Sequence, residues 1–227
     1  MGFRFERDRM IQELKELNIH RSDNTWCIQK RLDDMGVPRK NYIIADGASK
    51  ICLVFKDKPF VIKWSYNKEE AMQEVENYQK AIAENLEMFF PQTAHLCTFN
   101  DVDFVVQEKI DYSVNDLMRD MSPDILRTRG RLEKISKTAK DRIAAKMEKE
   151  FRKAGDGYHR DLDRIWAKVA CSLYGKNVCK RLCNFVVENG INDLHSNNIG
   201  YKGNRPIILD FSGYQESYSS EENSFWS

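Results

Sequence analysis

The stretch NYIIADGASKICLVFKDKPFVIKW, residues 41–64, decides how the first half of this chain folds. Its β-branched and aromatic residues come in three runs, residues 42–45, 51–55 and 60–64, and such runs are typical of strands. A loop that contains Gly47 joins the first two runs, and an Asp-Lys-Pro turn joins the second and third. Because both connections are short, this stretch predicts three antiparallel strands in a meander.

The residues that follow extend this sheet. Residues 67–89 have apolar side chains at helical spacing and predict one helix. After Pro91, the runs at residues 94–99 and 103–109 predict two further strands. The expected order is therefore three strands, one helix and two strands. The apolar stripe of the predicted helix consists of Ala71, Val75, Tyr78 and Ile82.

The remaining residues are predicted to be mostly helical, which makes the fold class α+β. Apolar residues at helical spacing, polar starts and a Gly-Val-Pro stop predict two N-terminal helices that pack on the sheet. Residues 111–189 are predicted to be helical up to Gly190, and a strand follows at residues 206–211. The predicted units are a helical cap at 1–40, the sheet with its helix at 41–110, a helical part at 111–213 and a flexible polar tail at 214–227.

Composition and charge exclude several classes of protein. The chain has 227 residues, a formal net charge of +1 and six cysteines without C-x-x-C spacing. The near-zero net charge excludes a large field that would attract nucleic acid or a membrane to the chain as a whole. There is no signal-peptide pattern and no apolar run of about 18 residues, so we expect a cytoplasmic protein with no membrane partner and with reduced cysteines.

One part of the chain departs from this balance. Residues 119–160 carry 13 Lys and Arg against 7 Asp and Glu, an excess of six positive charges in a predicted helical insert. Such a surface can be solvated and inert, or it can bind an acidic partner such as an acidic protein, a phosphorylated ligand or nucleic acid. The sequence leaves these two interpretations about equal.

The stretch INDLHSNNIGYKGNRPIILDFSG, residues 191–213, carries the candidate chemistry. If its polar tract is a loop and its apolar run is a strand beside that loop, the oxygens of Asp193, Asn198 and Asp210 converge. Mg²⁺ prefers hard oxygen ligands, and it keeps water molecules and substrate phosphates among its ligands. Asn198 and Asp210 are therefore enough ligands from the protein. Asp193 is then available to orient and deprotonate an acceptor hydroxyl.

This arrangement resembles the active site of the protein-kinase-like superfamily. There, a catalytic-loop Asp is followed five residues later by a metal-binding Asn and then by an Asp-Phe-Gly turn, which corresponds to Asp193, Asn198 and Asp210 here. The form DLHSNNI is similar to the aminoglycoside and choline kinase branch and its bacterial and phage relatives. Only 14 residues follow Gly213, so we expect no activation segment and no peptide-binding platform of the kind found in protein kinases.

The resemblance implies a two-lobed kinase-like fold with a lysine on the third strand, Lys63, paired with a glutamate on the next helix. At 100° per residue, Glu74 lies about 70° from the centre of the apolar stripe and Glu70 about 110°, so Glu74 is preferred and Glu70 is the reserve. The resemblance implies a wider set of nucleotide-binding residues. They are Gly47, Ala48 and Ser49 in the phosphate loop, Val61 and Ile44 beside the adenine, and Gln107, Glu108 and Lys109 at the connection between the lobes.

The resulting functional hypothesis is an ATP- and Mg²⁺-dependent phosphotransferase with Asp193, Lys63 and Glu74 as catalytic residues and Asn198 and Asp210 as metal ligands. The acceptor is an unknown hydroxyl compound, with a protein Ser or Thr slightly favoured over a small molecule of the aminoglycoside type. Two other hypotheses stay open. One is a nucleotide-binding pseudokinase or partner-binding module, and the other is nucleotidyl transfer from ATP bound in the reverse orientation.

Overall fold

The computed structural model describes residues 7–47, 49–139, 141–154, 163–191 and 193–212. The predicted polar tail at residues 214–227 and the predicted phosphate-loop residue Ala48 lie outside these ranges. No helix among the described residues combines the length and apolar character that crossing a membrane requires. All six cysteines are described, and none forms a disulfide.

The first part of the chain forms a five-stranded antiparallel sheet. Its strands are β1 (Tyr42–Asp46), β2 (Lys50–Phe55), β3 (Phe60–Ser65), β4 (Thr93–Phe99) and β5 (Val102–Glu108). Their order is β1-β2-β3-β5-β4, and every neighbouring pair is antiparallel. The structure therefore confirms the predicted three-stranded meander, the two later strands and the α+β class.

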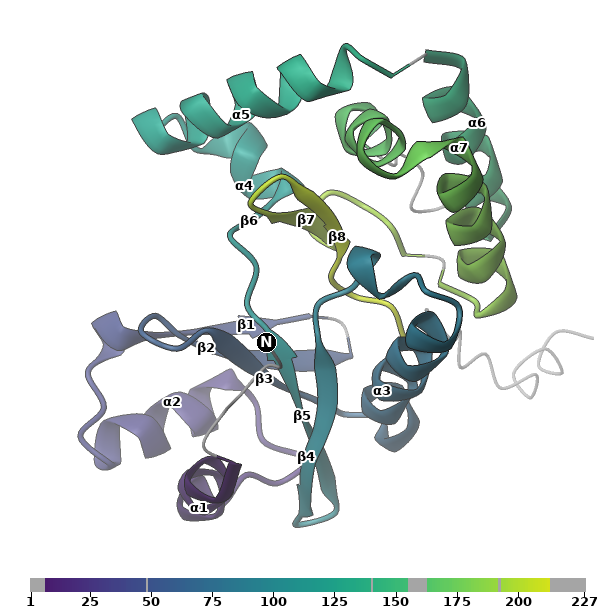
Figure 1. The fold of residues 1–227 in the computed structure, drawn as a ribbon. Helices are drawn as coiled ribbons and strands as arrows, with labels where there is room; N and C mark the ends of the chain where they lie inside the picture. The colour runs from purple at the N-terminus through teal and green to yellow at the C-terminus, as the bar shows by residue number, and fades with distance from the viewer. Residues whose placement is uncertain (1–6, 48, 140, 155–162, 192, 213–227) are drawn as a thin grey trace, which may run out of the picture.

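One face of this sheet packs on the N-terminal helices α1 (Arg7–Leu17) and α2 (Thr25–Asp34), as Figure 1 shows. Because side chains alternate along a strand, Ile62 and Trp64 of β3 enter this core while Lys63 points to the other face. The buried residues of the two helices, the sheet and the segment between the helices form one continuous hydrophobic core. The predicted packing of the helical cap on the sheet is therefore confirmed.

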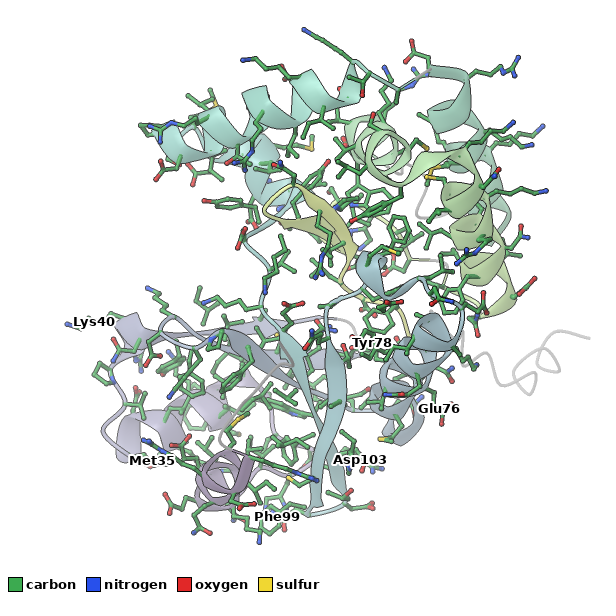
Figure 2. All side chains as sticks on the ribbon, in the orientation of Figure 1. Met35, Lys40, Glu76, Tyr78, Phe99 and Asp103 are labelled. Carbon is green, nitrogen blue, oxygen red and sulfur yellow. The ribbon has the colours of Figure 1, made fainter. Side chains whose placement is uncertain are left out.

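Helix α3 (Lys68–Ala83) packs against β3, β4 and β5. Ala71 and Tyr78 are buried as predicted. Ile82 is 44% exposed, so the prediction that Ile82 belongs to the buried stripe was wrong. The buried face is rotated toward Glu74, which is only 1% exposed. A carboxylate can lie there because it has cationic partners, which a hydrophobic pattern does not reveal. Tyr78, labelled in Figure 2, belongs to a second hydrophobic cluster that is formed mainly by residues 114–211.

The second part of the chain is mostly helical and surrounds a small sheet, as Figure 1 shows. Its helices are α4 (Val114–Arg119), α5 (Pro123–Ser136), α6 (Asp141–Ala154) and α7 (Arg164–Glu188). Its strands are β6 (Tyr112–Ser113), β7 (Ile199–Lys202) and β8 (Arg205–Ile208), and short 3₁₀ helices lie at Arg39–Asn41 and Glu87–Phe89. Of this small sheet the sequence predicted only β8, because β6 is two residues long and β7 starts inside the polar tract.

Glycines position the elements of this second part. Gly175 interrupts α7 with φ 79°, and Gly190 follows its end with φ 63°, where the sequence predicted a stop. Gly200 in β7 is required for a different reason. A Cβ atom at Gly200 would lie 2.3 Å from the carbonyl oxygen of Tyr112, so the close pairing of β6 and β7 requires glycine there.

Candidate functional site

A cleft of about 780 Å³ opens between the five-stranded sheet and the segments next to β7 and β8. One wall is formed by β1, β2, β3 and β5, and the other by residues from 193–198 and 209–212. The cleft thus joins side chains from both halves of the sequence. The predicted site residues that line it are Gly47, Ser49, Val61, Lys63, Gln107, Glu108, Lys109, Asp193, Asn198 and Asp210.

Glu74 lies behind the cleft and pairs with Lys63. The ammonium nitrogen of Lys63 is 3.4 Å and 3.3 Å from the two carboxylate oxygens of Glu74, and it also donates to the carbonyl oxygen of Leu209 at 2.9 Å. Glu70, the reserve residue, accepts instead from the hydroxyl of Ser65 at 3.1 Å. The structure therefore brings together the pair that helix geometry selected.

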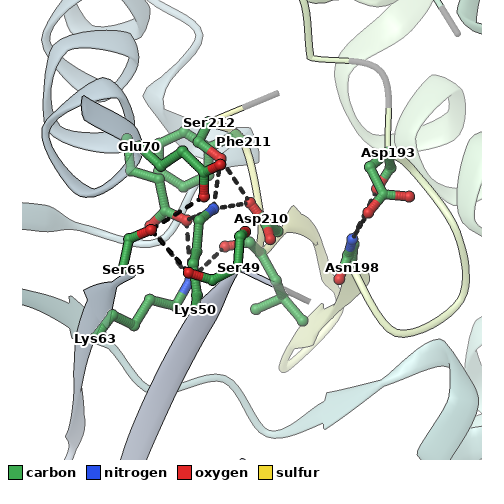
Figure 3. A network of polar contacts seen from close by, with 12 residues as sticks. Ser49, Lys50, Lys63, Ser65, Glu70, Asp193, Asn198, Asp210, Phe211 and Ser212 are labelled. Carbon is green, nitrogen blue, oxygen red and sulfur yellow. Dashed lines mark hydrogen bonds and ion pairs between the residues drawn. The ribbon is translucent and has the colours of Figure 1, made fainter. Parts of the chain in front are cut away.

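A second lysine, Lys50, enters the same cluster and was not among the predicted site residues. It begins β2, and its ammonium group lies 2.9 Å from a carboxylate oxygen of Glu74 and 2.5 Å from Oδ1 of Asp210. It also donates to the hydroxyl of Ser212, as Figure 3 shows. Strand alternation does place Lys50, with Cys52, on the cleft face, but its partners are up to 162 residues away in the sequence.

The cluster holds opposite charges together: the side chains of Lys50, Lys63 and Glu74 are largely shielded from water, and that of Asp210 is 32% exposed. Burial by itself would raise the pKa of Asp210, but the ammonium groups of Lys50 and Lys63 outweigh burial and hold this pKa well below its ordinary value. Burial by itself would lower the pKa of Lys50, but the carboxylates of Glu74 and Asp210 outweigh burial and raise it. Asp210 is therefore a carboxylate, and Lys50 a cation, at neutral pH.

Two amide side chains complete the cluster. Gln107 is buried, and its Nε2 lies 3.3 Å from Glu74 Oε2 and 3.2 Å from Thr93 Oγ1. Asn77 of α3 donates from Nδ2 to the carbonyl oxygen of Phe211 at 2.7 Å. The side chain of Gln107 therefore supports Glu74, a role that its predicted place at the connection between the lobes did not suggest.

The backbone at this connection is already engaged with the protein. The amide of Glu108 donates to the carbonyl oxygen of Gln92 at 2.8 Å, and the amide of Lys109 donates to that of Pro59 at 2.9 Å. The carboxylate of Glu108 pairs with Lys202, whose positive charge helps to hold the pKa of Glu108 below its ordinary value despite burial. The amides of residues 108 and 109 are therefore not free to donate to a base bound at this edge.

The expectation that Ile44 forms a wall of this cleft was wrong. Ile44 pairs in register with Leu53, and both side chains face the core beside α1 and α2. The neighbouring residue Ala45 pairs with Cys52, and both line the cleft together with Val54. The error has a simple cause, since a shift of one residue along a strand moves a side chain to the other face of the sheet.

The structure describes Gly47 and Ser49 of the phosphate loop predicted between β1 and β2. The amide of Gly47 donates to the carbonyl oxygen of Lys50 at 2.8 Å. The carbonyl oxygen of Ser49 accepts from the amide of Tyr66 and from the hydroxyl of Ser65. The Gly47 amide is therefore already bonded to the first residue of β2, and the positive charge next to Gly47 and Ser49 comes from Lys50.

The opposite wall carries the predicted catalytic loop. Asn198 Nδ2 donates to Oδ2 of Asp193 at 2.8 Å and to its carbonyl oxygen at 2.9 Å, as Figure 3 shows. The carbonyl oxygen of Asn198 accepts from the amide of Leu209, which ties this loop to the residue before Asp210. His195 Nε2 lies 3.5 Å from Oδ1 of Asp193, and this contact raises the pKa of His195 although burial opposes it.

These residues fit a magnesium ion held largely by water and phosphate. Asp210 offers a carboxylate, and Asn198 offers its carboxamide oxygen because its amide nitrogen is directed toward Asp193. Both are hard oxygen donors on the same cleft. The described residues contain no group of three or more His, Cys, Asp or Glu that could hold a metal without such additional ligands.

Comparisons with protein-family models, with curated proteins and with solved structures gave no significant match for this chain. The function therefore has to be inferred from the site. Two features matter most: a buried cluster of two lysines and two carboxylates on one side of the cleft, and Asp193 with Asn198 on the other.

Proposed function

We propose that this chain is a kinase-like phosphotransferase that uses ATP and Mg²⁺, with the five-stranded sheet and the helical part as its two lobes. The strongest support for this proposal is that Lys63 contacts both Glu74 and the carbonyl oxygen of Leu209. Leu209 is the residue immediately before Asp210, so Lys63 is held next to this carboxylate. A lysine held in this way can bind phosphates, and the adjacent carboxylate can bind a metal ion. Asp193 and Asn198 line the same cleft.

Each residue has a separate role in the proposed reaction. Lys63, oriented by Glu74, donates hydrogen bonds to the nucleotide phosphates. Asn198 and Asp210 would hold Mg²⁺, which neutralises phosphate charge when it is bound. Asp193 orients the acceptor hydroxyl and receives its proton. The hydroxyl oxygen forms a bond to the γ-phosphorus while the bond between that phosphorus and the bridging oxygen of ADP breaks.

We favour a protein Ser or Thr as acceptor over a polycationic small molecule. The helical insert presents exposed positive side chains, which would attract an acidic protein and repel a polycation. Members of this exposed basic surface are Arg127, Arg131, Lys134, Lys137, Arg142, Lys146 and Lys149. A neutral or acidic small molecule with a hydroxyl group remains compatible with the same cleft.

The experiment is transfer of γ-labelled phosphate from ATP in the presence of Mg²⁺. The acceptors are the chain itself, a mixture of generic proteins and a panel of aminoglycosides, and intact mass separates added phosphate from added AMP. We expect transfer by the wild type and by Glu70→Gln, the matched control, and loss of transfer in Asp193→Asn and Asp210→Asn. Glu70 is the suitable control because it lies on the same helix and contacts Ser65 and not Lys63.

The outcomes separate the hypotheses. A wild type that is stabilised by ATP with Mg²⁺ but transfers neither phosphate nor AMP would support the pseudokinase hypothesis. Addition of AMP would support nucleotidyl transfer. A wild type that neither binds ATP nor transfers any group would refute the proposed function.

A further inference from the structure

The feature that the proposed function leaves unexplained is Lys50. The cleft contains two lysines beside one metal-ligand carboxylate, and Lys50 is the one that contacts Asp210 directly, at 2.5 Å from Oδ1. We propose that Lys50 is a tethered cation that occupies Asp210 until a divalent metal ion displaces it. This inference rests on the proposed function in one respect, the assignment of Asp210 as a metal ligand.

The contacts of the two lysines differ in a way that supports this division. Lys63 contacts Glu74 at 3.3 Å and the carbonyl oxygen of Leu209 at 2.9 Å, which holds it beside α3. Lys50 contacts Glu74 at 2.9 Å and continues to Asp210 and Ser212. Removal of Lys50 from Asp210 would therefore leave Glu74 still paired with Lys63.

The ammonium group of Lys50 and a divalent metal ion compete for the carboxylate of Asp210. The side chain of Lys50 is only 11% exposed, so its ammonium group is a partly dehydrated partner of Asp210. A divalent ion would coordinate oxygen at about 2.1 Å, which brings two cations into repulsive contact if Lys50 stays in place. The four-carbon stem of lysine is flexible enough to carry the ammonium group away from Asp210 and into the cleft.

The charges of the cluster predict how the loss of Lys50 would change the affinity of Asp210 for a metal ion. Lys50 and Lys63 balance Glu74 and Asp210, so the wild-type cluster is neutral and attracts metal ions weakly in the absence of nucleotide. Without the ammonium group of Lys50, one negative charge remains uncompensated. The nucleotide-free protein should then bind a divalent ion more tightly at Asp210.

The test is titration of nucleotide-free, full-length protein with Mn²⁺, followed by the electron paramagnetic resonance signal of the unbound ion. We expect Lys50→Met to lower the dissociation constant for Mn²⁺ about tenfold, and the Lys50→Met, Asp210→Asn double variant to lose this gain. Lys50→Arg keeps the charge and should bind as the wild type does. Lys56→Met is the matched control, since Lys56 is an exposed lysine just past the other end of the same strand.

A second measurement uses only the wild type, in case Lys50→Met does not fold. An amine-acetylating reagent is applied without Mg²⁺ and with Mg²⁺ at a concentration high enough to saturate the wild-type protein, and acetylation of each lysine is followed by mass spectrometry. Acetylation of Lys50 should increase at least threefold with Mg²⁺, while that of Lys56 stays constant. An unchanged Mn²⁺ affinity in a folded Lys50→Met variant, or an unchanged acetylation of Lys50, would overturn the inference.

Neither measurement contains a nucleotide, so the inference and the proposed function can fail separately. If the wild type transfers no phosphate but Lys50→Met gains Mn²⁺ affinity, the phosphotransferase proposal fails and the role of Lys50 stands. If the wild type transfers phosphate and the Mn²⁺ affinity of Lys50→Met is unchanged, only the role of Lys50 fails.

Discussion

Replacing Glu74 by glutamine should destabilise the protein by about 3 kcal/mol, close to the lower end of the range for removing one charge from a buried ion pair. Glu74 is 1% exposed and accepts hydrogen bonds from Lys50, Lys63 and Gln107. Two of these bonds are charged, and each such bond contributes about 1.5–3 kcal/mol. The expected loss of stability is smaller than the sum of these contributions, because in the variant Lys50 is still paired with Asp210 and Lys63 still donates to the carbonyl oxygen of Leu209.

The measurement is the free energy of unfolding in urea at neutral pH, with Glu70→Gln as the matched control. Glu70 is on the same helix and bonds to one hydroxyl, that of Ser65, so its replacement should cost less than about 1 kcal/mol. A loss below about 1 kcal/mol for Glu74→Gln would refute the reasoning that Glu74 compensates two buried cations, because the range for a broken buried pair starts well above that value. Equal losses in both variants would refute it as well, since they would point to a general effect of neutralising a carboxylate on this helix.

Three further predictions test other parts of the structure. The pairing of Asp23 with Arg31 lowers the pKa of Asp23, although burial alone would raise it. The pair therefore stabilises the folded protein above the ordinary pKa of Asp, about 4, and this stabilisation is lost as the pH falls through the lowered pKa. Unfolding in urea should therefore show a gap of about 2 kcal/mol between the wild type and Asp23→Asn at pH 7 that shrinks in acid, and a gap independent of pH would contradict the pairing. Gly200→Ala should lower the stability by more than about 2 kcal/mol in thermal unfolding because of its 2.3 Å contact, whereas Gly130→Ala, inside α5 with open space around it, should raise the stability by about 0.5–1 kcal/mol. Asp193→Asn should reduce phosphate transfer by about 10²–10⁴-fold while ATP with Mg²⁺ still raises its melting temperature, and an unchanged rate would exclude Asp193 as the base.

Local patterns were sufficient wherever the structure depends on neighbours in sequence. The runs in residues 41–64 specified three strands because β-branched residues and short polar connections favour a meander. The helical wheel of α3 selected Glu74 over Glu70 because angular position on a helix follows from spacing alone. The stop at Gly190 followed from the ease with which glycine adopts a positive φ.

The same patterns failed where a side chain has its partners in a distant segment. The resemblance placed Ile44 in the cleft, and alternation along the strand could not correct this because it does not reveal which face packs on α1 and α2. The burial of Glu74, and with it the exposure of Ile82, depended on cations from two other strands. The buried role of Gln107 likewise depends on its contact with Glu74 of α3.

The sequence by itself determined the five strands of the larger sheet, most of the helices and the residue types available for chemistry, because these depend on spacing over a few residues. Only the tertiary structure decided which charges meet. Lys50 and Asp210 are 160 residues apart, and no local rule distinguishes Lys50 from the many solvated lysines of this chain. The physical reason is that an ion pair depends on distance and on exclusion of water, and both are set by packing of the sheet against residues 209–212.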